Sequence, residues 1–241
     1  VDVRDYIKTD AFYRDGKVDW EKTQQNIKQL KTDKLIITQG FLGSNKEQKT
    51  TTLGREGSDF TAAIFAFCLE AKSVTIWKDV PGVLNADPRF FENTQLLKQI
   101  SYNEAIEMAF YGASVIHPKT LKPLENKNIP LYVRSFYQLE NNGTTVSKGV
   151  ALEPKTACYI LKKNQILIAI SAKDFSFMVE ENLSDIFKKL HEFKLKVNLI
   201  QNSAISFSVC IEDKYNMFNN FLKEINLKYK VNYTNNVALY T

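Results

Sequence analysis

Cysteine is scarce in this chain, whose 241 residues include three cysteines. They lie far apart, each inside an apolar segment, and no two form a Cys-x-x-Cys pair. Disulfide frameworks and zinc sites are built from several cysteines or histidines at short, regular spacings. The sequence therefore argues against both kinds of site, and we predict that Cys68, Cys158 and Cys210 are small apolar core residues.

Long apolar runs and dense blocks of one charge are also missing. No stretch reaches the roughly 18 apolar residues of a membrane-spanning helix, and the first residues lack the basic and then apolar pattern of a secretory signal. The net charge of +5 is spread over lysines interleaved with acidic residues, which argues against nucleic acid as the main partner. We predict a cytoplasmic protein with no membrane span and no nucleic-acid partner.

The glycine-rich phosphate motifs of fixed spacing are absent as well, because neither a P-loop nor G-x-G-x-x-G occurs. The chain has instead a loop of small residues, TTTLGREGSD at 50–59, which runs into an apolar helix expected to begin near Phe60. Such a loop gathers backbone N–H groups at a helix N-terminus, which suits phosphate or carboxylate. Arg55 and Asp59 flank it with opposite charges. Two interpretations stay open: an anion site with a catalytic partner, or a helix that Ser58 caps.

The first part of the chain, residues 1–150, has the pattern of an α/β domain with a mostly parallel sheet. The expected elements are helices at 20–30, 59–71, 105–111 and after Pro118, and strands at 34–38, 73–77 and 129–135. Loops 40–45, 50–59 and 79–89 would then line one edge of the sheet, where α/β proteins bind ligands.

The pattern changes near residue 150, after a polar turn. Residues 151–241 predict a second domain, with strands at 165–171 and within 197–211 and 229–240, and with helices at 178–193 and 215–225. The break between the two central strands is expected around residues 201–203. This βαββαβ order is the ferredoxin-like arrangement.

Five segments together resemble the aspartate kinases of the amino-acid-kinase superfamily, in order and in spacing. They are ITQGFLGS (37–44), TTTLGREGSD (50–59), WKDVPGV (77–83), DPR (87–89) and GASVIHP (112–118). The resemblance extends to the second domain, because the family follows its kinase domain with ACT modules of βαββαβ order. It implies ATP-dependent phosphorylation of the side-chain carboxylate of L-aspartate to 4-phospho-L-aspartate, for the synthesis of lysine, threonine, methionine and isoleucine.

The resemblance also implies roles for particular residues. Arg55 would clamp the α-carboxylate of aspartate as a two-pronged ion pair, with Phe41 and Ser58 lining the same site, and Asp59 would be the catalytic aspartate that orients a lysine near the phosphates. The cofactors would be ATP and the Mg²⁺ bound to it, with no separate metal site. The nucleotide contacts would be Lys78, Asp79, Leu84, Arg89 and Ser114.

Several positions depart from the family pattern. Glu56 stands where the family commonly has glycine, Leu84 replaces a common aromatic residue, and Ser114 replaces a common lysine. The Lys-Phe-Gly-Gly-Thr-Ser motif that supplies the family's phosphate-binding lysine does not occur, and the chain starts with Val1. We therefore expect a fragment that binds nucleotide weakly and catalyses little by itself. Outside these motifs, His117 is expected to be structural.

The second domain is expected to be regulatory. In the family, a loop between ACT strands binds an inhibitory amino acid, usually lysine or threonine, and the matching residues are 198–204. Asn198, Gln201 and Asn202 are the candidate effector contacts, although the side chains of Gln201 and Asn202 equally suit a turn. Because a lone ACT module exposes a sheet edge or face, we expect a homodimer or a higher homo-oligomer.

Two alternative functions remain open from the sequence. One is a noncatalytic amino-acid-sensing protein in which the kinase domain serves as a scaffold. The other is the kinase part of a bifunctional aspartokinase and homoserine dehydrogenase, which a dinucleotide-binding fingerprint further along the gene would reveal.

Overall fold

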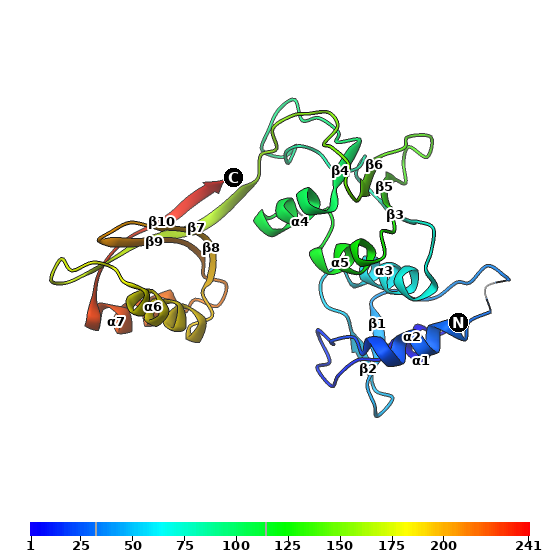
Figure 1. Ribbon diagram of the computed structural model, residues 1–241, viewed down its shortest axis with the longest axis horizontal. Coiled ribbons are helices and arrows are strands. Elements are labelled where there is room, and N and C mark those ends of the chain that lie inside the picture. The colour runs from blue at the N-terminus through cyan, green and yellow to red at the C-terminus, as the bar shows by residue number, and fades with distance from the viewer. Residues whose placement is uncertain (32, 114) are drawn as a thin grey trace. The chain divides into compact units, whose positions relative to one another are not determined.

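The computed structural model describes residues 1–31, 33–113 and 115–241. The chain divides into two compact units, Val1–Tyr159 and Ile160–Thr241, each of which has an apolar core (Figure 1). Within the described ranges, no helix is both long enough and apolar enough to cross a bilayer.

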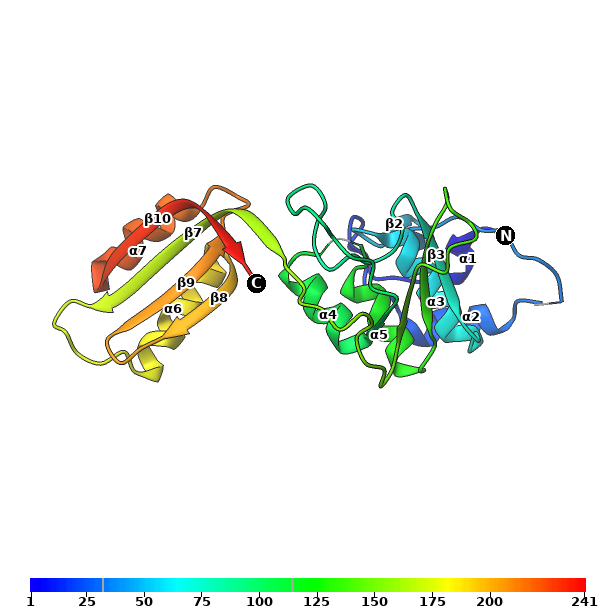
Figure 2. The same ribbon diagram turned by 90° about the horizontal axis from the view of Figure 1, so that it is seen from above.

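The first unit begins with three helices and a short hairpin that share one core (Figure 2). The helices are α1 (Val3–Tyr6), α2 (Trp20–Lys28) and α3 (Gly57–Leu69), and the antiparallel hairpin pairs β1 (Leu42–Ser44) with β2 (Thr50–Thr52). Helix α3 is apolar on nearly all sides, which agrees with burial of most of its surface. The core contains Val3, Ile7, Ile27, Leu53, Phe60, Ile64 and Cys68.

A four-stranded mixed sheet forms the rest of the first unit. Its order is β3 (Val74–Lys78), β5 (Leu131–Ser135), β6 (Thr144–Ser147) and β4 (Gln99–Ser101). The β3–β5 and β4–β6 pairs are parallel, and the central β5–β6 pair is antiparallel. The helices α4 (Tyr102–Tyr111) and α5 (Pro118–Asn126) lie between β4 and β5 in the chain. The α/β class is thus confirmed, with one antiparallel pairing in the sheet.

Local sequence signals account for the ends of α4 and α5. Ser101 and Glu104 form a capping box at the start of α4, and Gly112, at φ 121°, ends it. His117 caps α5 because its Nδ1 accepts a hydrogen bond from the backbone N–H of Lys119 at 3.2 Å. The expectation of a structural histidine is therefore confirmed.

The strand expected at residues 34–38 is wrong. These residues are irregular, and Leu35 and Ile37 are 90% and 77% exposed. The carbonyl of Ile37 accepts a hydrogen bond from the N-terminal ammonium of Val1 rather than from a neighbouring strand. An apolar run becomes a strand only when another strand satisfies its backbone groups, and no described strand lies beside this one.

The helix expected from Phe60 begins earlier, at Gly57. Ser58 therefore lies in the first turn of α3 and does not cap it, and the residue at the cap position is Glu56, whose side chain makes no capping hydrogen bond. The interpretation of residues 50–59 as a helix capped by Ser58 is thus wrong.

The second unit has the predicted βαββαβ order. Its strands are β7 (Leu161–Ala172), β8 (Lys196–Asn202), β9 (Ser206–Glu212) and β10 (Tyr229–Tyr240), and its helices are α6 (Glu180–Glu192) and α7 (Phe218–Lys228). The sheet order is β10-β7-β9-β8, with every neighbouring pair antiparallel. Both helices lie on one side of this sheet (Figure 1), where Ile168, Ile186, Phe207, Val209 and Phe221 are fully buried or nearly so.

The boundary between the two units lies after Tyr159, later than the position near residue 150 that the polar turn suggested. Residues beyond 150 stay with the first unit because they hydrogen-bond to it. Glu153 exchanges backbone hydrogen bonds with Gln99, and the N–H of Tyr159 donates to the carbonyl of Asn85. The polar turn at 140–145 connects strand β5 to strand β6 and does not mark the end of the unit.

Candidate active site at the start of helix α3

The loop before α3 has a backbone that small residues make possible. Gly54 has φ 78°, and Glu56, at φ 54°, is also left-handed, which costs free energy for any residue with a Cβ atom. A Cβ atom on Gly57 would lie 2.8 Å from the Cβ of Phe41, too close for any larger side chain. The glycines therefore bring the helix N-terminus close to the residues before β1.

Phe41 and Ser58, two of the predicted substrate residues, lie next to each other. The N–H of Phe41 donates to Thr61 Oγ1 at 2.9 Å, and the same hydroxyl donates to the carbonyl of Gly57 at 2.9 Å. A Cβ atom on Gly40 would lie 2.9 Å from Ser58 Oγ, so Ser58 faces the backbone just before Phe41. Phe41 itself is half exposed. The two residues thus form one wall beside the start of α3.

Arg55 points its guanidinium into solvent from the same loop. Its side chain is 74% exposed, and its Nε atom lies 4.0 Å from Glu56 Oε1. This separation is too long for a hydrogen bond, and exposed ion pairs of this kind hold a side chain weakly. The guanidinium therefore remains available to an incoming carboxylate.

Asp59 and Lys78 form an ion pair that joins α3 to the end of β3. Lys78 Nζ lies 2.8 Å from Asp59 Oδ2, and the two side chains are only 20% and 16% exposed. The contact is electrostatic, since no described donor is aligned well enough to hydrogen-bond to this buried oxygen. Asp59 lies in the first turn of α3, where the helix dipole favours negative charge. The pair places a lysine ammonium at the beginning of the helix.

An exposed guanidinium, a partly buried ammonium and a helix N-terminus thus lie at the start of α3, next to the glycine-lined loop. The model of the amino acid kinase family matches residues 2–135. The chain belongs to the amino acid kinase family.

Aspartokinases are among the relatives of this amino acid kinase. It is 38% identical over 180 residues to the lysine-sensitive aspartokinase 3 of Escherichia coli, a match that covers 74% of this chain and 39% of the relative. It is 32% identical over 234 residues to a bifunctional aspartokinase/homoserine dehydrogenase of Buchnera aphidicola, a match that covers 95% of this chain and 29% of the relative. The chain thus spans less than two thirds of each relative's length.

A solved structure with the same architecture is that of E. coli aspartokinase III in complex with lysine and aspartate. The match has a TM-score of 0.81 at 32% identity and covers 100% of this chain and 56% of that one. The similarity includes the βαββαβ unit as well as the kinase unit. The predicted combination of an amino-acid-kinase fold with a ferredoxin-like second domain is therefore confirmed.

The predicted nucleotide residues of this amino acid kinase are only partly brought together. Lys78 ends β3 and Asp79 follows it, exposed to solvent. Leu84 is half-buried in an isolated bridge with Leu96. Arg89 is exposed and pairs with Asp87 at 2.6 Å, which holds the pKa of that carboxyl below its usual range. Ser114 lies outside the described residues.

A second charged group beside Gly54 was not predicted. Lys119 pairs with Asp15, and a Cβ atom on Gly54 would collide with the Asp15 carboxylate. His117 lies close enough to Glu56 and Arg55 for both to act on its titration, but burial dominates and lowers its pKa. The sequence signals this close approach only by the glycine at position 54, whose left-handed backbone the structure shows.

The predicted effector residues lie on strand β8 rather than in a loop, because the turn to β9 comes later, after Asn202. Asn198 is buried and already paired: its Oδ1 accepts from Lys162 Nζ at 2.9 Å and its Nδ2 donates to Gln165 Oε1 at 2.6 Å. Burial lowers the pKa of Lys162. Gln201 and Asn202 are exposed at the end of the strand. The structure thus separates Asn198 from the other two candidates.

Proposed function

We propose that this amino acid kinase acts as part of an aspartate kinase, which transfers the γ-phosphoryl group of ATP to the side-chain carboxylate of L-aspartate. The products would be 4-phospho-L-aspartate and ADP. One observation carries the proposal: Arg55 and the Asp59–Lys78 pair lie at the start of the same glycine-lined helix. The similarity to aspartokinases over most of the chain supports the choice of aspartate as the substrate.

The positions of the charges suit this reaction. A carboxylate oxygen of aspartate forms a bond to the γ-phosphorus while the bond to the bridging oxygen of ADP breaks, so no proton needs to be abstracted from the nucleophile. Catalysis then depends on alignment and on positive charge around the transferred group. Arg55 would bind the α-carboxylate of aspartate, with Phe41 and Ser58 beside it, and leave the side-chain carboxylate free to react.

Asp59 and Lys78 would act on the phosphate side. Because Asp59 holds the ammonium of Lys78 at 2.8 Å, Lys78 need not be ordered when the nucleotide binds. Mg²⁺ would enter with the triphosphate, as is usual for this metal, and offset its repulsion of the carboxylate. Asp79, Leu84, Arg89 and Ser114 remain proposed nucleotide contacts, and Arg89 would have to leave Asp87 to reach a phosphate.

The test is chemical trapping of the product made by the complete gene product. Acyl phosphates react with hydroxylamine, so incubation with ATP, Mg²⁺ and L-aspartate should yield aspartyl hydroxamate. L-asparagine is the matched control because it keeps the α-carboxylate and lacks the nucleophile. Hydroxamate formation that needs both ATP and aspartate supports the proposal. Binding of an amino acid without any hydroxamate would favour the noncatalytic sensor instead.

We also propose that the second unit binds a feedback amino acid, lysine or threonine, and that it pairs with a second copy of the chain. The similarity to a lysine-sensitive aspartokinase supports the regulatory role. Gln201 and Asn202 are the proposed contacts, since both are exposed while Asn198 is already paired. Calorimetry should show heat of binding for one of the two amino acids, reduced in Gln201→Ala. Equal binding by that variant would exclude Gln201.

A further inference from the structure

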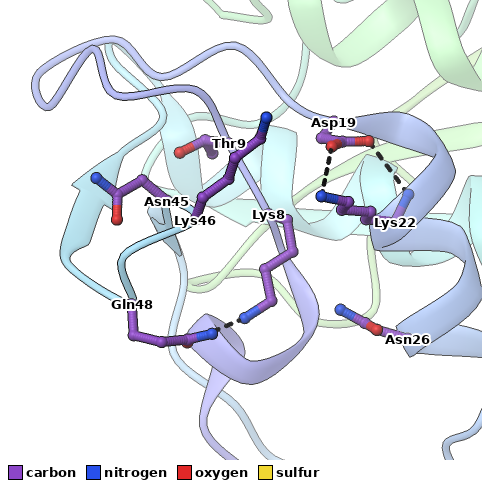
Figure 3. A pocket seen from close by; sticks show the side chains of 8 residues that line it. All are labelled: Lys8, Thr9, Asp19, Lys22, Asn26, Asn45, Lys46 and Gln48. Atoms are coloured by element: carbon purple, nitrogen blue, oxygen red, sulfur yellow. Dashed lines mark hydrogen bonds and ion pairs between the residues drawn. The ribbon is translucent and has the colours of Figure 1, made fainter.

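A polar pocket of about 330 Å³ lies in the first unit and shares no residue with the site at the start of α3. Figure 3 shows it between α2 on one side and the β1–β2 turn on the other, with the side chain of Lys8 between them. Lys22 and Asp19 lie on the α2 side, and Lys46 and Gln48 lie on the turn. The volume is near the lower end for small-molecule sites and far larger than a single water needs.

Lys8 is held in place by neutral oxygen atoms. Its Nζ atom donates to the carbonyl of Arg4 at 3.0 Å, to Ser44 Oγ at 2.9 Å and to Gln48 Oε1 at 3.3 Å. The side chain is half-buried, yet none of these three partners is a carboxylate. A half-buried ammonium group that lacks a counter-ion attracts an anion. A bound anion would supply the missing charge.

Positively charged side chains outnumber carboxylates among the residues that line the pocket. Lys22 Nζ lies 3.9 Å from Asp19 Oδ2, and the other oxygen of Asp19 is occupied in capping α2, where it accepts from the N–H of Lys22. Lys46 is exposed on the β1–β2 turn, and no ion pair joins it to a described carboxylate. Three lysines thus face one carboxylate, and the N-terminus of α2 adds positive potential.

We propose that this pocket binds a small organic phosphate. The phosphate would lie among the ammonium groups of Lys8, Lys22 and Lys46, which bind anions as point charges. The other end of the ligand would carry hydroxyl groups, because Asn26 turns its Nδ2 atom towards the carbonyls of Asp5 and Tyr6 and keeps its oxygen as an acceptor. The pocket is a binding site and not a second catalytic centre.

The test is calorimetric titration of the full chain with ribose 5-phosphate, with ribose as the uncharged control. The proposal predicts that ribose 5-phosphate binds and that ribose does not. Lys46→Gln should weaken it about tenfold, since it removes one charge-assisted hydrogen bond. Lys49→Gln is the matched control: Lys49 lies on the same turn but pairs with Glu47 at 2.7 Å and does not line the pocket. It should bind as tightly as the unmodified chain.

Two further variants keep the result interpretable. Lys8→Met should reduce binding more than Lys46→Gln, and circular dichroism must show that it remains folded. If the Lys8→Met protein is unfolded, Lys46→Gln still tests whether the pocket binds the phosphate. The side chain of Lys46 is exposed and makes no described contact, so its replacement should not affect folding. Arg55→Gln locates the ligand, since it should leave binding unchanged. Absence of binding, equal affinity in Lys46→Gln, or loss of binding in Arg55→Gln alone would each overturn the proposal.

Discussion

Strand β8 of the second unit and the start of α3 in the first unit differ in how their partly buried polar groups are hydrogen-bonded. In the second unit, a continuous series of hydrogen bonds runs from Lys162 through Asn198 and Gln165 to the carbonyl of Lys163. At the start of α3, Glu56 Oε2 is buried without a hydrogen bond from the described residues, and Asp59 Oδ2 has its ion pair with Lys78 but no aligned hydrogen bond. Buried polar atoms usually find partners, and those that do not often mark a functional site. The difference separates a sheet whose polar side chains bond to one another from a loop whose buried oxygens lack aligned hydrogen bonds.

If the two units differ in this way, they should unfold separately. A substitution in the core of the second unit should give the largest effect. Phe221→Ala removes a fully buried ring of the second unit and should lower its stability by about 3–5 kcal/mol. Both tryptophans, Trp20 and Trp77, lie in the first unit, so fluorescence follows that unit while far-UV circular dichroism follows both. The fluorescence midpoint should not move. Leu227→Ala, at an exposed position of the same helix, should have little effect on either signal. A shared shift in the Phe221→Ala protein would show that the units unfold together.

A substitution in the hydrogen-bond network of Lys162, Asn198 and Gln165 should have the next largest effect on stability. Asn198→Ala leaves Lys162 Nζ and Gln165 Oε1 without this partner, which should cost about 1–3 kcal/mol in the free energy of unfolding. Gln201→Ala, on the exposed part of the same strand, is the control and should change stability little. Urea denaturation followed by circular dichroism measures both. Equal stabilities would mean that the network is not what distinguishes this unit.

A substitution in the loop before α3 should change stability in the opposite direction, because Glu56 has a left-handed backbone and a buried oxygen without a hydrogen bond. Glu56→Gly relieves a left-handed backbone and removes a buried carboxylate oxygen without a partner, so the unit should gain about 1 kcal/mol. Glu70→Gly is the matched control: Glu70 has φ 51°, but its carboxylate is exposed and paired with Lys127. It should gain less. A Glu56→Gly protein no more stable than Glu70→Gly would remove the evidence for a strained loop.

The smallest expected effect is a pH dependence of the first unit. Burial lowers the pKa of His117 in the folded state below its ordinary value near 6.5. Between the folded and unfolded pKa values the unfolded chain binds more protons, so stability rises with pH through this window and is lost as pH falls. Protonated Nδ1 also cannot accept the N–H of Lys119. His117→Asn keeps a capping acceptor that does not titrate. Its fluorescence-detected midpoint should fall less on acidification, and equal slopes would exclude His117 as the cause.

Local signals in the sequence were enough to predict much of the fold. The helix that became α4, the apolar character of α3 and the βαββαβ order all depend on residues close together in the chain. The strand expected at 34–38 failed because a strand needs a partner, which an apolar run such as Leu35 to Ile37 does not reveal. The helix start was misplaced because left-handed Glu56 allows α3 to begin at Gly57.

The sequence was enough to predict which loop forms the candidate site, but not which of its residues form ion pairs. Arg55 and Ser58 could be named from the segment at 50–59, and Phe41 from the segment at 37–44. The contact of Lys78 with Asp59 joins residues from a strand end and a helix start, and only the folded chain shows it. The effector interpretation of Asn198 had the same limit, because its partners Lys162 and Gln165 belong to another strand. Residue type predicted polarity at these positions, and tertiary contacts decided which groups remain available.

We propose that the Asp59–Lys78 pair serves phosphoryl transfer, and kcat of the complete gene product tests this role most directly. Asp59→Asn and Lys78→Met should each lower kcat for aspartyl phosphate formation by about 10²–10³-fold, as loss of one preorganised charge does. The double variant should lose little more than either single variant, because the two residues act as a unit. Asp33→Asn, at an exposed position outside the site, should be unaffected. An Asp59→Asn enzyme with nearly unchanged kcat, or fully additive losses, would contradict the account.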